Sequence, residues 1–90
     1  MTNINEKMRE QVEIMNNAIM HNRVWNLWSV LYEIQNIDEH AKVQVVAGFF
    51  PIFTAKPAMP KTIIKRMSGK DEKTRVNGVQ MHNGVIYVVA

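Results

Sequence analysis

The residues of this chain with the clearest chemical meaning are cations clustered in its second half. Seven of the eleven lysines and arginines fall within residues 56–75, where Asp71 and Glu72 are the only carboxylates. This stretch carries five net positive charges, whereas residues 1–55 carry a net charge of minus two. Clustered cations attract phosphates and acidic surfaces but say little about fold. The seven cations are Lys56, Lys61, Lys65, Arg66, Lys70, Lys73 and Arg75.

Six of these cations form the candidate binding site. Lysine ammonium groups neutralise phosphates and give a salt-dependent, largely sequence-independent affinity. Arg66 and Arg75 are better suited to bidentate contacts with bases or phosphates, because the guanidinium group is planar and forked. A lysine-rich stretch is most often a solvated surface, and the functional hypotheses are contact with nucleic acid or with an acidic protein surface. The residues assigned to this contact are Lys61, Lys65, Arg66, Lys70, Lys73 and Arg75.

Residue types that carry catalysis or bind metals are sparse. The chain has no cysteine, so it can form neither a disulfide nor a thiolate metal site. His21, His40 and His82 are too widely spaced for a local metal motif. The four glycines are isolated and do not form a phosphate-binding loop. We therefore expect a binding protein that is not an enzyme and that needs no cofactor or metal.

Length and composition indicate one domain, residues 1–90. We divide it into a helical part (1–48), a proline- and aromatic-rich connection (49–60), and a basic helix followed by a β-hairpin (61–90). Hydrophobic residues make up 47% of the chain, which is generous for its size and leaves apolar surface for a protein partner or for a homodimer.

The sequence carries no sign of membrane insertion. Its first ten residues include Glu6, Lys7 and Arg9 where a secretory signal would be apolar. The most apolar run, residues 43–53, is far shorter than the ~20 residues that span a bilayer. We expect a small soluble, cytoplasmic protein with no membrane contact.

Residues 2–20 have the pattern of an amphipathic helix. They contain neither glycine nor proline. Thr2 or Asn3 is the expected N-cap, and Glu6, three residues after Asn3, completes a capping-box pattern. The apolar residues repeat at spacings of three and four, which places them on one helical face. These residues are Ile4, Met8, Val12, Met15 and Ile19.

A second helical pattern covers residues 22–36, where a narrow polar stripe interrupts an otherwise apolar surface. The two apolar faces are out of phase, which favours a break at His21–Asn22. One long helix over residues 4–36 is the alternative, because a second stripe continues through both segments. Trp25, Trp28 and Tyr32 share this stripe, and we expect them to be core residues rather than anchors for a partner.

Residues 38–48 have conflicting signals. Asp38 suits a helix N-cap and Gly48 a helix terminus, whereas Val43–Val46 prefers a strand. We predict a third helix here, with a strand as the alternative.

The connection that follows contains three prolines and cannot be a continuous helix. It also supplies a second functional hypothesis, in which the chain is a protein–protein interaction module that acts as an inhibitor or adaptor of a larger complex. The apolar partner contact would then be formed by Phe49, Phe50 and Phe53.

The C-terminal third is predicted to form a short basic helix and a β-hairpin. The helix begins at Pro60 and is closed by Gly69, and the hairpin pairs residues 74–81 with residues 85–89 around Asn83-Gly84.

The expected fold is therefore α+β, with helices first and a C-terminal hairpin last. This order of elements is similar to that of winged-helix domains, in which the last helix enters the major groove and the hairpin tip contacts DNA. The similarity does not extend to the helix-turn-helix turn, which is usually ~3–4 residues long. Here eleven residues with prolines among them separate Gly48 from Pro60.

Overall fold

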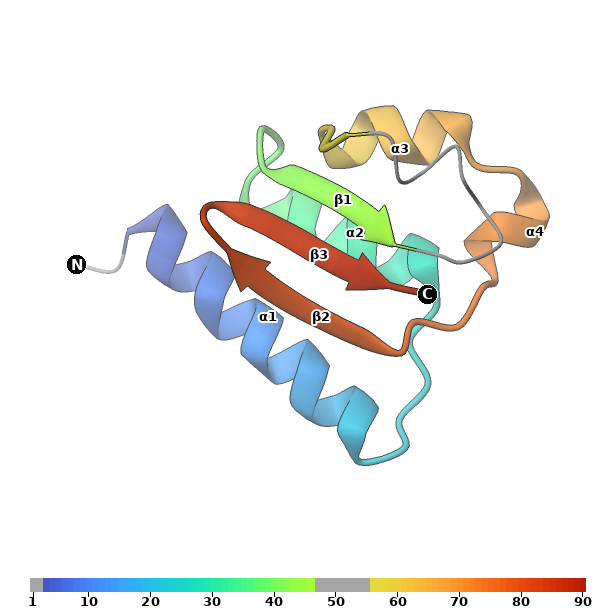
Figure 1. Cartoon of the computed structure of the whole chain (residues 1–90), viewed down its shortest axis with the longest axis horizontal. Helices are drawn as coiled ribbons and strands as arrows, with labels where there is room; N and C mark the ends of the chain where they lie inside the picture. Colours follow the sequence, from blue (N-terminus) through green and yellow to red (C-terminus); the bar gives the residue numbers. More distant parts are fainter. Residues whose placement is uncertain (1–2, 47–55) are drawn as a thin grey trace.

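The fold consists of a three-stranded β-sheet with helices packed around it. The computed structural model describes residues 3–46 and 56–90. Within these residues the sheet has the order β1-β3-β2, and α2 lies behind it, while α1 runs beside β2 and α3 lies beyond β1 (Figure 1). The elements are α1 (Ile4–Met20), α2 (Leu27–Ile37), β1 (Lys42–Val46), α3 (Pro60–Arg66), α4 (Gly69–Glu72), β2 (Gly78–His82) and β3 (Val85–Val89).

The last strand, β3, is the centre of the sheet. It pairs in parallel with β1 and antiparallel with β2. Alternate residues of the three strands are buried in one hydrophobic core with the helices, because successive side chains of a strand point to opposite faces. On the opposite face Tyr87 lies between Gln44 of β1 and Gln80 of β2. The helical residues of this core include Met8, Val12, Met15, Ile19, Leu27, Val30, Leu31, Ile34 and Ile63.

The N-terminal part confirms two helices rather than one. The side-chain oxygen of Asn3 accepts a hydrogen bond from the backbone N–H of Glu6 at 2.8 Å, so the predicted cap of α1 is present. The chain leaves the helix at Asn22, whose φ of 64° lies in the left-handed region. The second helix begins later than predicted, at Leu27, because Asn26 caps it by accepting a bond from the N–H of Ser29.

The prediction of a helix over residues 38–48 was wrong, because Lys42–Val46 forms β1. Val43 and Val45 are fully buried, whereas Lys42 and Val46 are exposed. This alternation suits a strand that has one face against a core, and β3 supplies its hydrogen-bond partners. The local cap and terminator signals were outweighed by pairing with a distant segment.

The C-terminal part confirms the helix that begins at Pro60 and the hairpin turn at Asn83-Gly84. Asn83 and Gly84 both have positive φ, as the favoured two-residue hairpin turns require. The role predicted for Gly69 was wrong: it opens the four-residue helix α4 instead of ending the previous one. The structure therefore has the predicted sequence of helices followed by a hairpin, with β1 as an added strand.

The first hairpin strand is also shorter than the predicted 74–81. It begins at Gly78, because residues 74–76 pair with the segment before α2. Leu27 donates to the carbonyl of Thr74 at 2.8 Å, and Val76 donates to the carbonyl of Trp25 at 2.9 Å. In the described ranges, no helix is long and apolar enough to cross a bilayer.

Candidate binding surface

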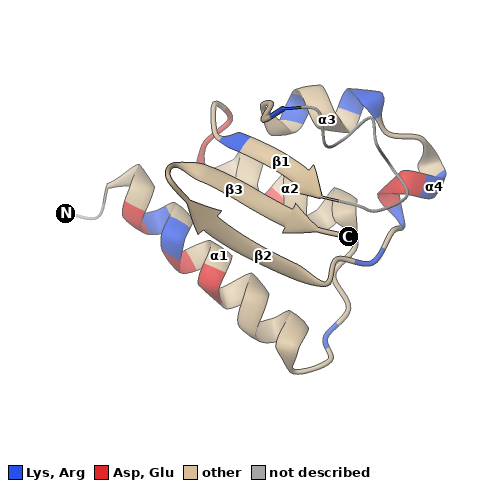
Figure 2. Cartoon of the chain, in the orientation of Figure 1, with Lys and Arg blue, Asp and Glu red and all other residues tan. Residues whose placement is uncertain are grey.

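Figure 2 shows that the cations of the second half follow one edge of the molecule. They lie on α3, on α4 and on the segment from α4 to β2, whereas the carboxylates lie on α1, on α2, near the turn before β1 and on α4. All six predicted site residues are exposed. We call this set the basic edge; it comprises Lys61, Lys65, Arg66, Lys70, Lys73 and Arg75.

The first part of the basic edge is held by α3. Pro60 and Ile63 are buried, and α3 packs against α2. Lys61 and Lys65 are four residues apart, so they share the exposed face of this helix. Arg66 ends the helix and is also exposed. Because α3 buries its apolar side against α2, its cations face solvent.

The second part of the basic edge surrounds α4. The backbone N–H of Ser68 donates to the carboxylate of Asp71 at 2.9 Å, and the Ser68 hydroxyl oxygen accepts from the N–H of Asp71 at 3.3 Å. This reciprocal capping box leaves Asp71 only 9% exposed. Asp71, one of the two carboxylates within residues 56–75, is thus hydrogen-bonded to the backbone and largely buried.

The end of the basic edge is fixed by its contact with the segment before α2. Arg75 forms an isolated antiparallel bridge with Asn26. Thr74 and Val76 on either side are hydrogen-bonded to Leu27 and Trp25. Arg75 is therefore presented from a fixed backbone rather than from a free loop, a feature that the sequence prediction of a strand here did not anticipate.

The cations of the basic edge are not neutralised by ion pairs within the described residues. The only ion pair recorded there joins Glu39 and His40, with Nε2 and Oε1 3.3 Å apart. Glu39 and Lys61 both line a small pocket of about 200 Å³, so an acid lies near this end of the basic edge.

The hairpin tip does not extend the basic edge. Arg75 precedes β2, whereas Asn83 and Gly84 lie at the other end of that strand, which corresponds to a separation of roughly 15 Å for five residues. The tip residues include no lysine or arginine. The contact pattern expected from winged-helix domains, in which a helix and a hairpin tip bind together, is therefore not reproduced by the cations.

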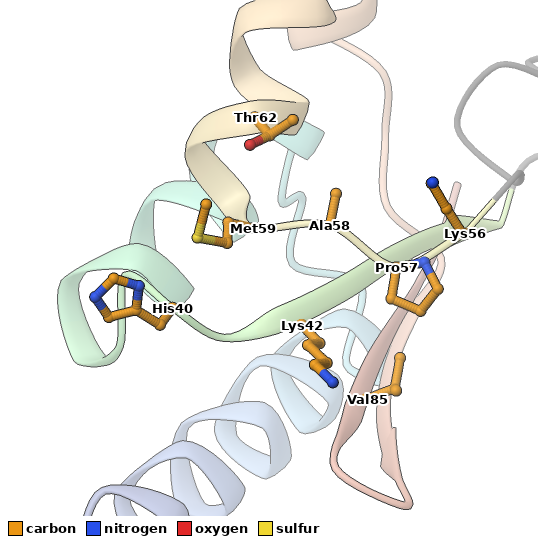
Figure 3. Close-up of a pocket in the computed structure, with 8 residues that line it drawn as sticks. All are labelled: His40, Lys42, Lys56, Pro57, Ala58, Met59, Thr62 and Val85. Atoms are coloured by element: carbon orange, nitrogen blue, oxygen red, sulfur yellow. The ribbon is translucent and has the colours of Figure 1, made fainter.

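A pocket that sequence analysis missed lies between the start of β1 and the segment that leads into α3 (Figure 3). It forms because the backbone of Ala58 and that of Val43 exchange two hydrogen bonds, both of 2.8 Å. This bridge brings Lys42 and Lys56 to one pocket of about 710 Å³. The pocket is lined by His40, Lys42, Lys56, Pro57, Ala58, Met59, Thr62 and Val85.

The alternation of polar and apolar residues in Lys42-Val43-Gln44-Val45 is the sequence signal from which the position of Lys42 could have been predicted. It indicates a strand, on which Lys42 and Val43 point to opposite faces. Because we predicted a helix there and grouped Lys42 with the acidic half, its place in the lining of this pocket was not foreseen.

The aromatic residues in and just before α2 are only in part core residues. Trp25 packs half-buried against the core, as predicted. The same prediction was wrong for Trp28 and Tyr32, which are 39% and 45% exposed. Their rings stack on each other, with centroids 4.9 Å apart and planes inclined by 14°. Because helical neighbours differ by about 100°, Trp28 lies off the stripe that buries Leu27.

Two other expectations concern sites for partners and metals. The apolar contact assigned to Phe49, Phe50 and Phe53 lies outside the described residues. Among residues 3–46 and 56–90 there is no group of three or more histidines and carboxylates that could hold a metal ion.

Comparison of the chain with protein-family models, curated proteins and solved structures finds no match.

Proposed function

We propose that this protein binds nucleic acid through the basic edge, as a non-catalytic or regulatory factor. The observation that carries the proposal is the exposure of six cations along connected elements, with no ion pair to any of them among the described residues. Phosphates are the ligand class that best fits such an edge, because they offer repeated negative charge along a strand.

Contact with the phosphate backbone explains the basic edge better than insertion of a helix into a groove. The helix that carries Lys61 and Lys65 has only seven residues and buries Pro60 and Ile63. One exposed side of so short an element can track phosphates but has little surface to read base edges. We therefore expect an affinity that depends strongly on salt and weakly on sequence.

Fluorescence anisotropy with labelled duplex and single-stranded oligonucleotides, over a series of salt concentrations, tests the proposal. If all six cations contact a duplex, the logarithm of the binding constant falls with the logarithm of salt with a slope of about −5. The double variant Lys65→Gln/Arg66→Gln should weaken binding and make this slope shallower by about 2.

The matched control is Lys7→Gln/Arg9→Gln, which makes the same change of net charge on α1, away from the basic edge. It should leave the slope nearly unchanged. Absence of binding to either nucleic acid at low salt, or equal losses in the two double variants, would contradict the proposal.

A second candidate function, binding of a protein partner, is favoured by the exposed stack of Trp28 and Tyr32. Tryptophan and tyrosine are enriched among the residues that dominate protein interfaces. A complex of this kind would survive high salt, would be lost in Trp28→Ala/Tyr32→Ala, and would persist in Lys65→Gln/Arg66→Gln. A partner recovered with the opposite dependence on these two variants would count against it.

A further inference from the structure

The fold brings the exposed stack of Trp28 and Tyr32 next to the basic edge, although the two lie far apart in the sequence. Leu27, which precedes Trp28, donates its backbone N–H to the carbonyl of Thr74 at 2.8 Å. The residue before it, Asn26, forms the bridge with Arg75. The first turn of α2 is therefore fixed beside the Arg75 end of the basic edge.

The stack also lies on the side of α2 that faces the other cations. Figure 1 shows α2 behind the sheet, running from the side of α4 toward the start of β1, with α3 above it in the view and α1 below. Leu27 and Leu31 are buried, and Trp28 and Tyr32 each follow one of them. Because a right-handed helix turns by about 100° per residue, this step moves both rings to the flank of α3 rather than that of α1. Helix α2 packs against both α3 and α4, which carry Lys61, Lys65, Arg66 and Lys70.

Two parallel exposed rings form a platform that a further flat ring can extend. The planes of Trp28 and Tyr32 are inclined by only 14°, so the stack leaves the outer surface of a ring for another aromatic group. Every nucleobase has such a flat surface, and proteins that bind single strands combine stacking rings with cations that follow the backbone. The stack and the basic edge supply these two parts on adjoining elements.

Unpaired bases fit this arrangement better than a duplex does. In a duplex the bases stack on one another, and a protein reaches only their edges in the grooves. A ring on the side of a helix then has no base surface to contact. A single strand can turn its bases toward aromatic side chains while its phosphates stay near cations.

We propose that Trp28 and Tyr32 stack on an unpaired base of a single-stranded nucleic acid whose phosphates lie along the basic edge. The inference rests on the function proposed above and narrows its ligand from nucleic acid to a single strand. The second candidate function assigns the same two rings to a protein partner, and the measurements that follow separate the two.

Fluorescence anisotropy with three labelled ligands tests the assignment: oligothymidylate, a stable abasic strand of the same length, and a duplex of that length. The abasic strand has the same phosphates but no bases. The wild type should bind oligothymidylate at least about fivefold more tightly than the abasic strand, because stacking of one base contributes at least this factor. Oligouridylate is titrated in parallel, and the tighter of the two strands identifies DNA or RNA as the source; either result supports the stack.

The variant Trp28→Leu/Tyr32→Leu removes both rings but keeps apolar side chains and the charge. It should weaken oligothymidylate by at least about fivefold, leave the abasic strand and the duplex within about twofold, and leave the salt slope unchanged. In contrast, Lys65→Gln/Arg66→Gln should weaken all three ligands and make the slope shallower. Circular dichroism and thermal melting establish that each variant is folded.

The matched aromatic control is Tyr87→Leu. Tyr87 lies on the sheet face opposite to the core and is half-buried between neighbouring strands. Its removal should leave the affinity for oligothymidylate within about twofold. A loss in Tyr87→Leu that is absent from Trp28→Leu/Tyr32→Leu would place the stacking site on the sheet and overturn the assignment.

The inference is also overturned if the wild type binds the abasic strand as tightly as oligothymidylate, or if Trp28→Leu/Tyr32→Leu binds oligothymidylate like the wild type. A protein partner that is lost in this variant, with no change in single-strand affinity, would overturn it in favour of the second candidate function. These outcomes leave the basic edge untouched, because its own test uses Lys65 and Arg66. Absence of binding to all three ligands at low salt would remove both proposals.

Discussion

Helix α1 and the α3–α4 region differ in how their charged side chains are arranged. On α1 the cations Lys7 and Arg9 lie between Glu6 and Glu10, so that opposite charges are mixed along this part of the helix. On α3 and the start of α4 the exposed charges have one sign, and the acid Asp71 is turned into the backbone. Interspersed charges keep a surface solvated, whereas charges of one sign create a field that reaches a partner. Under the function proposed above, α1 is part of the scaffold and the basic edge is the binding surface.

The two regions also differ in how they are stabilised. Helix α1 has 17 residues and a regular buried stripe, of which Met15 is the most enclosed member. Helices α3 and α4 have seven and four residues, too few to be stable alone, and they depend on contacts with α2. Substitutions should therefore affect folding most in α1 and binding most on the basic edge.

The largest effect on folding is expected for Met15→Ala. Met15 is fully buried, and truncation leaves a cavity that costs about 2–5 kcal/mol, a large part of the ~5–15 kcal/mol that stabilises a typical domain. Ile14→Ala is the control, because its side chain is 58% exposed and should change stability by less than about 0.5 kcal/mol. Urea unfolding followed by circular dichroism measures both. Equal losses for these neighbours would contradict the assigned packing of α1.

An intermediate effect is expected for Asp71→Ala. The substitution leaves the N–H of Ser68 without its acceptor and should cost about 1–2 kcal/mol. Glu72→Ala removes the same charge next to it and should cost less, because the structure gives Asp71 the capping role. The comparison is made by thermal melting of the two variants. If Glu72→Ala were the more damaging change, the capping box would not be what holds α4.

The smallest effect on folding is expected for Lys65→Gln/Arg66→Gln. Both side chains are exposed in the last turn of α3, where favourable interaction with the helix end is worth no more than about 1 kcal/mol each. The unfolding free energy should change little, while nucleic-acid affinity falls. A loss of stability as large as that of Met15→Ala would show that these residues are part of the scaffold and would remove the contrast between the two regions.

Elements with strong local signals could be predicted from the sequence. The repeat of Met8, Val12, Met15 and Ile19 defines α1 without reference to any other segment, and Asn83-Gly84 defines the hairpin turn through backbone conformation alone. The six cations of the basic edge were identified because charge and exposure follow directly from residue type.

Elements defined by distant partners could not be predicted in the same way. Lys42–Val46 becomes a strand because β3 pairs with it, and residues 74–76 leave the hairpin because the segment before α2 pairs with them. The pocket depends on the bridge between Val43 and Ala58, which joins segments that no local pattern relates. The exposure of Trp28 and Tyr32 was not predicted because α2 is apolar around most of its circumference. The sequence of such a helix does not show which side is buried, since the neighbouring elements determine it.

The central position of β3 has a consequence for the order of assembly. The strands β1 and β2 do not pair with each other. The sheet is therefore complete only when β3, the last of the three strands in the sequence, has paired with both of them. The crossover from β1 to β2 carries all six cations of the basic edge. Such non-local pairing is slow compared with helix formation. The connection that carries the basic edge is therefore fixed at both ends only once β3 has paired with β1 and with β2.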